Sequence, residues 1–290
     1  MLVSYDTITQ QLIAALTLKG YSEKTHEAYI GAVAGLARHY GRPPDGLSDG
    51  EIRDYLLGLL QVRKLSASTL NVAVSGLRFF YRQVLERSIA EVEKALPRPR
   101  QPKHYARVYS LAEIQTLLLR GCTQLRHRVF LMTVYGGGLR LNEACHLRLQ
   151  DIERDRMMLR VNQGKGRKDR YTILSPWLLE ELETYWRTYR PRLWLFPSPG
   201  APERPLKDRT AQKMFYGALA RSGLPHRGGI HSLRHSFATH LIESGVEITL
   251  IKELLGHRSL QTTANYLHVS GERFAKVRGP LDRIAPVRAT

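Results

Sequence analysis

The sequence has little cysteine and no long apolar run. Its 290 residues include two cysteines, Cys122 and Cys145, which stand in apolar surroundings without a partner at a metal-binding spacing. A disulfide framework or a cysteine-ligated zinc site is therefore disfavoured, and two buried, reduced thiols are expected. Apolar residues nowhere run on for the roughly 18 positions that a membrane helix needs. The N-terminus also lacks the pattern of a signal peptide, so we expect a cytoplasmic protein without membrane contact.

Acidic residues are scarce relative to basic ones. The chain has 44 lysines and arginines but only 26 acidic residues, which gives a formal net charge of +18 and a pI near 10.2. Such an excess favours a polyanionic partner, with nucleic acid ahead of an anionic membrane surface. The excess is uneven, because residues 1–95 carry a net charge of +1 and residues 96–290 a net charge of +17.

Residues 1–95 have the pattern of a four-helix bundle. Apolar residues recur at helical spacing in four segments that Gly, Pro or Ser residues separate. The third segment begins with Ser48 and Glu51, the spacing of a capping box. Short connections between four helices favour a compact bundle. The expected helices cover residues 6–19, 22–40, 48–60 and 66–85.

A basic connector follows over residues 96–108. It holds three prolines and four basic residues without an acidic one, which opposes regular structure. We therefore predict two domains, residues 1–95 and residues 109–290. A connector of this composition is expected to follow the phosphate backbone of DNA, and a solvated tether is the alternative. Its basic residues are Arg98, Arg100, Lys103 and Arg107.

Residues 109–290 predict a mixed, mostly helical domain. The hydrophobic period changes to two in Met157–Val161 and Tyr171–Leu174, which predicts a small antiparallel hairpin with Lys165 at its tip. The fold class is therefore mainly α, with a small antiparallel sheet in the second domain. The expected helices cover residues 110–119, 126–135, 139–149, 176–189, 209–222, 247–255 and 259–267, and one more begins at His231.

The stretch from His231 to Tyr266 concentrates histidine, arginine and tyrosine at helical spacing. His231 and Arg234 are three residues apart and share one helix face. His257 follows Gly256 at an expected helix end, and Tyr266 comes nine residues later. These residue types suit chemistry on a phosphodiester, which needs charge stabilisation, a nucleophile and a proton donor. The acidic clusters that hold Mg²⁺ are missing, and guanidinium groups can replace the metal. We therefore expect no metal and no cofactor.

Six positions, in order along the chain, resemble the tyrosine recombinases, or phage-integrase family, which includes the Xer-type and Cre-like enzymes. The matching motifs are Gly138-Leu139-Arg140 with Glu143, Gly164-Lys165-Gly166, His231-Ser232-Leu233-Arg234, Leu255-Gly256-His257, and Thr262-Thr263 ahead of Tyr266. The resemblance covers nearly the whole chain, because the four-helix part is similar to the core-binding domain of that family.

The resemblance implies a role for each matching residue. Tyr266 would attack the scissile phosphate and form a 3′-phosphotyrosyl bond, while Arg140 and Arg234 would bind the non-bridging oxygens. His231 would exchange the tyrosine proton, because histidine titrates near neutrality. Lys165 would protonate the leaving 5′-oxygen and His257 would add a donor to the phosphate. Glu143 resembles a partner that orients Arg140.

Each of these residues has a plainer interpretation when taken alone. Gly256 is explained by a helix C-cap, and Tyr266 by a core tyrosine with a satisfied hydroxyl. His231 and His235 have a zinc-ligand spacing, but the glutamate of a metalloprotease motif is absent. His235 and His240 are expected to pack or form structural hydrogen bonds. Three basic residues near the hairpin are expected to contact DNA phosphates, with a solvated turn as the alternative: Arg167, Lys168 and Arg170.

The resemblance also implies an assembly. Four protomers would hold two double-stranded DNA sites and exchange strands through a four-way junction, with the C-terminal segment contacting a neighbouring protomer. The pattern matches a minimal, Xer-like form without an added arm-binding domain. Two rival functions remain, a type IB topoisomerase that relaxes DNA and a DNA-binding or architectural protein without catalysis. Covalent trapping on a nicked substrate separates them.

Overall fold

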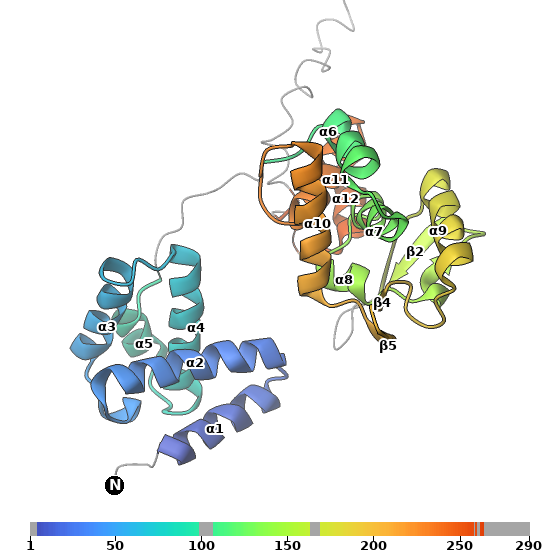
Figure 1. Cartoon of the computed structure of the whole chain (residues 1–290). Helices are drawn as coiled ribbons and strands as arrows, with labels where there is room; N and C mark the ends of the chain where they lie inside the picture. The colour runs from blue at the N-terminus through green and yellow to red at the C-terminus, as the bar shows by residue number, and fades with distance from the viewer. Residues whose placement is uncertain (1–4, 99–106, 163–168, 258, 260–261, 264–290) are drawn as a thin grey trace, which may run out of the picture. The chain divides into compact units, whose positions relative to one another are not determined.

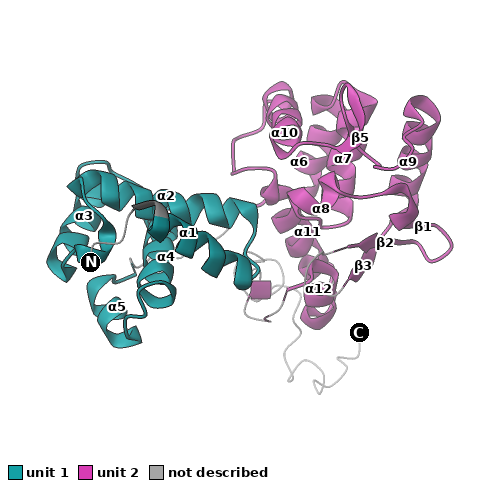
Figure 2. Ribbon diagram, turned by 90° about the horizontal axis from the view of Figure 1, so that it is seen from below, with its two compact units in different colours: residues 1–103 teal, residues 104–290 magenta. Residues whose placement is uncertain are grey.

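The computed structural model divides the chain into two compact units. Unit 1 spans Met1–Lys103 and unit 2 spans His104–Thr290, shown in teal and magenta in Figure 2. The division falls inside the connector predicted over residues 96–108. Leu96, the first residue of that segment, is fully buried in the core of unit 1 and so does not belong to a connector. The structure describes residues 5–98, 107–162, 169–257, 259 and 262–263 (Figure 1).

Unit 1 contains the four expected helices and a fifth that was not predicted. The fifth helix, α5, begins at a capping box of Ser88 and Glu91 and buries Val92. With seven residues it is too short to show a hydrophobic period, which is why the sequence pattern missed it. The helices are α1 (Tyr5–Leu18), α2 (Glu23–Tyr40), α3 (Asp49–Gln61), α4 (Ala67–Gln83) and α5 (Ile89–Ala95), with a 3-10 turn η1 (Pro44–Gly46).

Apolar packing and serine caps hold unit 1 together. Serine begins α2, α3, α4 and α5, and in each case its hydroxyl accepts the backbone N–H three residues on. Leu36, Val74 and Phe80 are fully buried in one core. The buried Tyr81 donates its hydroxyl to the carbonyl of Pro44 at 2.8 Å, so that the polar tip of this core residue is satisfied.

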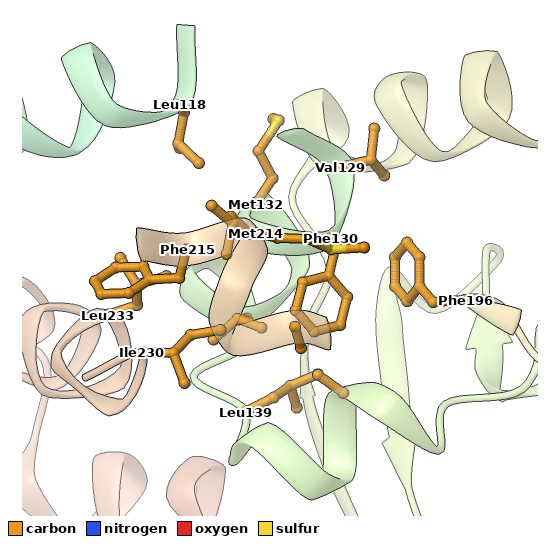
Figure 3. Close-up of a cluster of buried hydrophobic side chains, with 14 of the residues drawn as sticks. Leu118, Val129, Phe130, Met132, Leu139, Phe196, Met214, Phe215, Ile230 and Leu233 are labelled. Atoms are coloured by element: carbon orange, nitrogen blue, oxygen red, sulfur yellow. The ribbon is translucent and has the colours of Figure 1, made fainter. Parts of the chain in front are cut away.

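Unit 2 is built around α7, whose residues Val129–Val134 are all buried. Figure 3 shows this core, where Phe130 packs edge-on against Phe196 with ring centroids 5.1 Å apart. The helices of unit 2 are α6 (Leu111–Thr116), α7 (Leu125–Gly136), α8 (Leu141–Cys145), α9 (Pro176–Tyr189), α10 (Asp208–Ser222), α11 (His231–Glu243) and α12 (Ile248–Leu255). Two short turns complete them, the π-helical η2 (Leu117–Gly121) and the 3-10 turn η3 (Leu149–Asp151). No helix of the described residues is long and apolar enough to cross a membrane.

The expected hairpin is part of a three-stranded antiparallel sheet. Strands β2 (Met158–Val161) and β3 (Arg170–Ile173) pair with Arg160 opposite Tyr171, and β1 (Ile152–Glu153) adds a strand on the other side of β2. Lys165, expected at the tip, lies outside the described residues.

A second sheet was not predicted. Strands β4 (Pro197–Ser198) and β5 (Ala201–Pro205) pair in a segment for which the sequence pattern predicted neither helix nor strand. Their prolines remove the alternating pattern by which a strand is recognised, and Gly200 at φ +75° makes the turn between them possible. Of the helix expected over residues 259–267, only 259, 262 and 263 are described.

Candidate active site

Arg140 and Arg234 are brought together by a glycine turn. Gly138 precedes Arg140 at φ +57°, and a Cβ there would lie 2.4 Å from a ring carbon of Phe237 on α11. Only glycine allows both that backbone conformation and that close approach. This close approach places the Gly138 carbonyl beside α11, where it accepts a hydrogen bond from Nη1 of Arg234 at 2.6 Å. The Gly138-Leu139-Arg140 motif therefore connects the start of α8 to α11 through these contacts.

Glu143 lies at the centre of the site and joins three arginines. One carboxylate oxygen, Oε2, accepts the backbone N–H of Arg140 at 2.8 Å and Nη2 of Arg170 at 2.9 Å. The other, Oε1, accepts Nη1 of Arg140 at 2.7 Å, and Nη1 of Arg234 lies 3.8 Å from Oε2. Burial would raise the pKa of Glu143, but the charges of Arg170 and Arg140 hold it below its usual value. The carboxylate is therefore ionised at neutral pH.

Arg170 does not take the role predicted for it. We expected a DNA phosphate contact, but its side chain is only 7% exposed. Besides bonding Glu143, its Nε donates to the carbonyl of Leu254 at 2.8 Å. Side chains alternate between the two faces of strand β3, and Arg170 lies on the buried face. The number of basic residues around the turn does not indicate which face each of them occupies.

The C-terminal end of α12 receives all three guanidinium groups. Arg170 donates to the carbonyl of Leu254 at 2.8 Å, Arg234 to that of Leu255 at 2.6 Å, and Arg140 to that of Gly256 at 3.3 Å. The last carbonyls of a helix lack partners within the helix and carry a partial negative charge, so cations are favoured there. Gly256 then ends α12 in the left-handed conformation at φ +62°. The three arginines thus set where the chain leaves α12.

His257 follows directly and is a neutral acceptor in this arrangement. Nη2 of Arg234 lies 3.1 Å from Nε2 of His257, and since a guanidinium can only donate, Nε2 must accept. The proton then sits on Nδ1, which donates to the hydroxyl of Thr263 at 2.9 Å. Burial, together with the charges of Arg234 and Arg140, lowers the pKa of His257 to about 4. Sequence reasoning missed Thr263 as a partner, although it belongs to the Thr-Thr pair ahead of Tyr266.

His231 begins α11 one turn before Arg234, and its side chain is exposed. Its pKa is lowered, first by partial burial of the ring and then by the charges of Arg234 and Arg140. An exposed, mostly neutral imidazole beside two guanidinium groups is able to accept a proton from a ligand group.

Several predicted residues are not placed by the structure. Arg98 and Arg107 are described and exposed, and their DNA contacts stay predictions. Of the remaining predicted site residues, six lie outside the described residues: Arg100, Lys103, Lys165, Arg167, Lys168 and Tyr266.

Another histidine of α11, His240, takes part in a structural contact. His240 accepts or donates through Nδ1 with the hydroxyl of Tyr135 at 2.9 Å, a structural contact as expected. Across the described ranges, no three His, Cys, Asp or Glu side chains group closely enough to hold a metal ion.

The described part of the site has an excess of positive charge. Arg140, Arg170 and Arg234 surround one carboxylate, and His257 is neutral. Arg140 is also reachable, with 31% of its side chain exposed. Two fixed guanidinium groups beside neutral imidazoles suit an anion whose oxygens accept forked hydrogen bonds, as a phosphate does.

Comparisons with known proteins agree with this chemistry. The model of the "Phage integrase family" matches residues 104–273, and that of "Phage integrase, N-terminal SAM-like domain" matches residues 8–91. A putative integrase/recombinase of Sinorhizobium fredii is 39% identical over 277 residues, covering 95% of this chain and 88% of the relative. The tyrosine recombinase XerA of Thermococcus onnurineus is 33% identical over 270 residues, covering 91% of each protein.

A solved structure shares the fold. A lambda integrase tetramer bound to a Holliday junction aligns with a TM-score of 0.73 and 20% identity, covering 96% of this chain and 81% of that one. The two family models together account for both units, and the curated relatives cover most of the chain. The chain therefore belongs to the phage integrase family of tyrosine-type site-specific recombinases, enzymes that act on DNA.

Proposed function

We propose that unit 2 cleaves and rejoins duplex DNA through a covalent bond between Tyr266 and a 3′-phosphate. The observation that carries this proposal is the convergence of Arg140 and Arg234 on one carboxylate and one helix end. A fixed pair of guanidinium groups favours a transition state that carries extra negative charge on phosphorus. Tyr266 follows Thr263 by three residues, and Thr263 is bonded to His257 within the site.

Arg140 and Arg234 bind the two non-bridging oxygens of the scissile phosphate in this mechanism. Their positions are set before DNA arrives, because Glu143 already orients Arg140 and the carbonyl of Gly138 already orients Arg234. Prior orientation matters since no protein reorganisation is then needed when the charge develops.

The remaining side chains move protons. His231 takes the proton of the Tyr266 hydroxyl as that oxygen attacks phosphorus, and Lys165 gives a proton to the departing 5′-oxygen. His257 contributes a hydrogen bond to the phosphate once Arg234 releases Nε2 and the imidazole proton moves from Nδ1 to Nε2, with the Thr263 hydroxyl then donating to Nδ1. Reversal of the same steps by a second 5′-hydroxyl reseals the strand. Because the phosphotyrosyl bond keeps the energy of the original ester, neither ATP nor another cofactor is required.

Both units contribute to DNA binding in this proposal. Residues 1–95 act as a helical, SAM-like core-binding domain and residues 109–290 as the catalytic domain. The basic segment between them follows the phosphate backbone, with Arg98, Arg100, Lys103 and Arg107 as contacts. Near the β2–β3 turn, Arg167 and Lys168 take the same role. The reaction needs access to the genome, and two buried cysteines that form no disulfide suit the reducing cytoplasm.

Strand exchange between two sites requires more than one protomer. The solved lambda integrase complex is a tetramer on a Holliday junction, and we propose the same assembly for this chain. The segment after Tyr266 would contact the next protomer, which couples the position of the nucleophile to assembly. The biological reaction would be integration, excision or resolution of DNA, as on a mobile element.

The target DNA site must be identified before the mechanism can be tested. Purified protein is incubated with sheared DNA from the region around its own coding sequence, and fragments that stay bound in detergent are sequenced. A duplex with the recovered site, nicked so that the strand cannot reseal, then traps the intermediate. Wild type is expected to form a detergent-stable adduct, and Tyr266→Phe none.

Two outcomes contradict the proposal. An adduct formed equally by Tyr266→Phe rules out the nucleophile. Failure of wild type to retain any fragment in detergent, or to form an adduct with the nicked duplex, rules out the mechanism. Relaxation of supercoiled DNA without joining of two sites would favour a topoisomerase instead.

A further inference from the structure

Arg170 differs from the other two arginines of the site in the hydrogen-bond donors that it has left for a ligand. Its side chain is 7% exposed, against 31% for Arg140, and it projects from β3 toward Glu143 and the end of α12. Arg234 is as buried, at 5%, but its Nη2 lies against His257. In Arg170, Nε and Nη2 are already bonded to Leu254 and Glu143, and the remaining nitrogen, Nη1, is itself buried, so it has no donor to offer a phosphate. Arg170 therefore has a different task from the arginines that bind the substrate.

The two hydrogen bonds of Arg170 hold Glu143 and the last turn of α12, which Arg140 and Arg234 hold less firmly by themselves. The bond to Glu143 Oε2 fixes the carboxylate that orients Arg140. The bond from Nε to the carbonyl of Leu254 fixes the last turn of α12, two residues before the left-handed Gly256. Arg140 holds that same end only through a longer, 3.3 Å bond to Gly256.

Phosphate binding will compete for donors at this helix end. When Arg140 and Arg234 turn their N–H groups to phosphate oxygens, their bonds to Gly256 and Leu255 weaken, because each N–H serves one strong acceptor at a time. Two of the three cations that satisfy the end of α12 are then shared with the substrate. Arg170, which the substrate does not reach, is the one that stays.

We propose that Arg170 is a positioning residue, which holds Glu143 and the end of α12, and thus His257, in place while Arg140 and Arg234 engage the phosphate. The inference rests on the proposed function, because it assigns Arg140 and Arg234 to the scissile phosphate. The site then contains a third guanidinium, that of Arg170, which binds no substrate and keeps its position when the phosphate binds.

The arrangement is not one that stability alone favours. Nη1 of Arg170 is buried and has no hydrogen-bond partner among the described residues, and such an unpaired donor on a charged group is destabilising. Buried ion pairs are often replaced by apolar residues at no loss of stability. A buried arginine kept in this state is consistent with a role in geometry.

The experiment compares Arg170→Met with a matched control, Arg160→Met. Arg160 lies on the neighbouring strand β2 and pairs with the buried Asp151 at 3.0 Å, but it has no bond to α12. Each variant is measured for its rate of adduct formation on the nicked duplex and for noncovalent DNA affinity in a Tyr266→Phe background. Thermal unfolding of each variant reports the effect on the fold.

Arg170→Met is expected to slow adduct formation on the order of 100-fold, since a misplaced catalytic group costs that much, while DNA affinity changes by less than about threefold. Arg170→Lys keeps the charge but only one of the two bonds, and is expected to recover about tenfold of that loss. Arg160→Met is expected to cleave within about threefold of wild type.

A second readout does not depend on cleavage. The imidazole resonances of His257 in the DNA-free protein are expected to shift in Arg170→Met and to stay unchanged in Arg160→Met. If wild type forms no adduct, the proposed function fails, and this readout still decides the position of His257. The inference is overturned by unchanged His257 resonances, by cleavage within threefold of wild type, or by affinity that falls in proportion to the rate.

Discussion

Two carboxylates of unit 2, the largely buried Glu143 and the buried Asp151, are bound locally in the same way. Each lies three residues after an arginine that begins a short helix or turn, Arg140 for α8 and Arg148 for η3. Each accepts the backbone N–H of that arginine, at 2.8 and 2.9 Å. One motif, an arginine followed by a capping carboxylate, therefore occurs twice within twelve residues.

Strand arginines complete both pairs. Arg170 of β3 donates to Glu143 at 2.9 Å, and Arg160 of β2 donates to Asp151 at 3.0 Å. The two carboxylates differ in the other guanidinium groups that lie near them. The guanidinium of Arg148 turns away to the ring of Trp194, 5.1 Å from its centroid.

Around Glu143 the balance of charge is different. The guanidinium of Arg140 returns to the carboxylate, Arg234 approaches from α11, and the end of α12 receives both. Within the described chain, Asp151 is balanced by one guanidinium and Glu143 faces three. The same local motif thus stabilises structure when its charge is balanced. It becomes a site for an anion when cations are in excess.

The largest effect is expected from removing the reachable guanidinium. Arg140→Ala takes away a fixed donor to the phosphate, and loss of one such donor costs on the order of 10²–10³-fold in rate. Its counterpart, Arg148→Ala, removes a side-chain contact to Trp194, outside the cluster around Glu143, and is expected to leave the rate within about threefold. Single-turnover adduct formation on the nicked duplex measures both, and equal losses would erase the distinction between the two clusters.

Neutralising each carboxylate is expected to have opposite consequences. Glu143→Gln weakens the orientation of Arg140 and is expected to slow adduct formation roughly 10- to 100-fold. Asp151→Asn is expected to leave that rate almost unchanged but to lower the free energy of unfolding by about 1–3 kcal/mol, because Arg160 loses its charged partner. Urea unfolding supplies the second value. A rate loss in Asp151→Asn as large as that in Glu143→Gln would contradict the assignment.

A smaller effect is expected at Thr263. Thr263→Val removes the acceptor of His257 Nδ1, a single hydrogen bond worth about 1 kcal/mol, and is expected to slow adduct formation about fivefold. Thr263→Ser keeps the hydroxyl and serves as the control. Identical rates in the two variants would show that the bond does not hold His257 for the reaction.

The smallest effect concerns pH. The folded pKa of His257, about 4, lies below its unfolded value near 6.5, so protons bind the unfolded chain more tightly. The stability that this group contributes is present above pH 6.5 and is lost as the pH falls toward 4. Between pH 7 and pH 5, wild type should lose about 1 kcal/mol more than His257→Gln, after allowance for solvent screening. Other histidines with lowered pKa affect both proteins alike, and equal losses would contradict the neutral state assigned to His257.

Local patterns in the sequence predicted the elements well where the pattern is long. The helices of unit 1 up to Gln83 and the β2–β3 pairing follow from periodicity and capping residues. The helix α5, the strand β1 and the β4–β5 pair were missed, because two to seven residues carry too little pattern.

The site was predictable only in part. Motif spacing identified Arg140, Arg234 and His257, and the structure brings these three together with Glu143. The role of Arg170 was misassigned because its burial depends on α12, which packs on β3 from more than 80 residues away in the chain. The carbonyls that receive the arginines have no signature in the sequence, since every residue carries one.

The most direct measurement identifies the residue that carries the DNA. The adduct from the nicked duplex is digested with protease and nuclease, and the modified peptide is sequenced by mass spectrometry. The proposed mechanism predicts a single nucleotide joined through its 3′-phosphate to Tyr266. A nucleotide on any other side chain, or one joined through a 5′-phosphate, would contradict it.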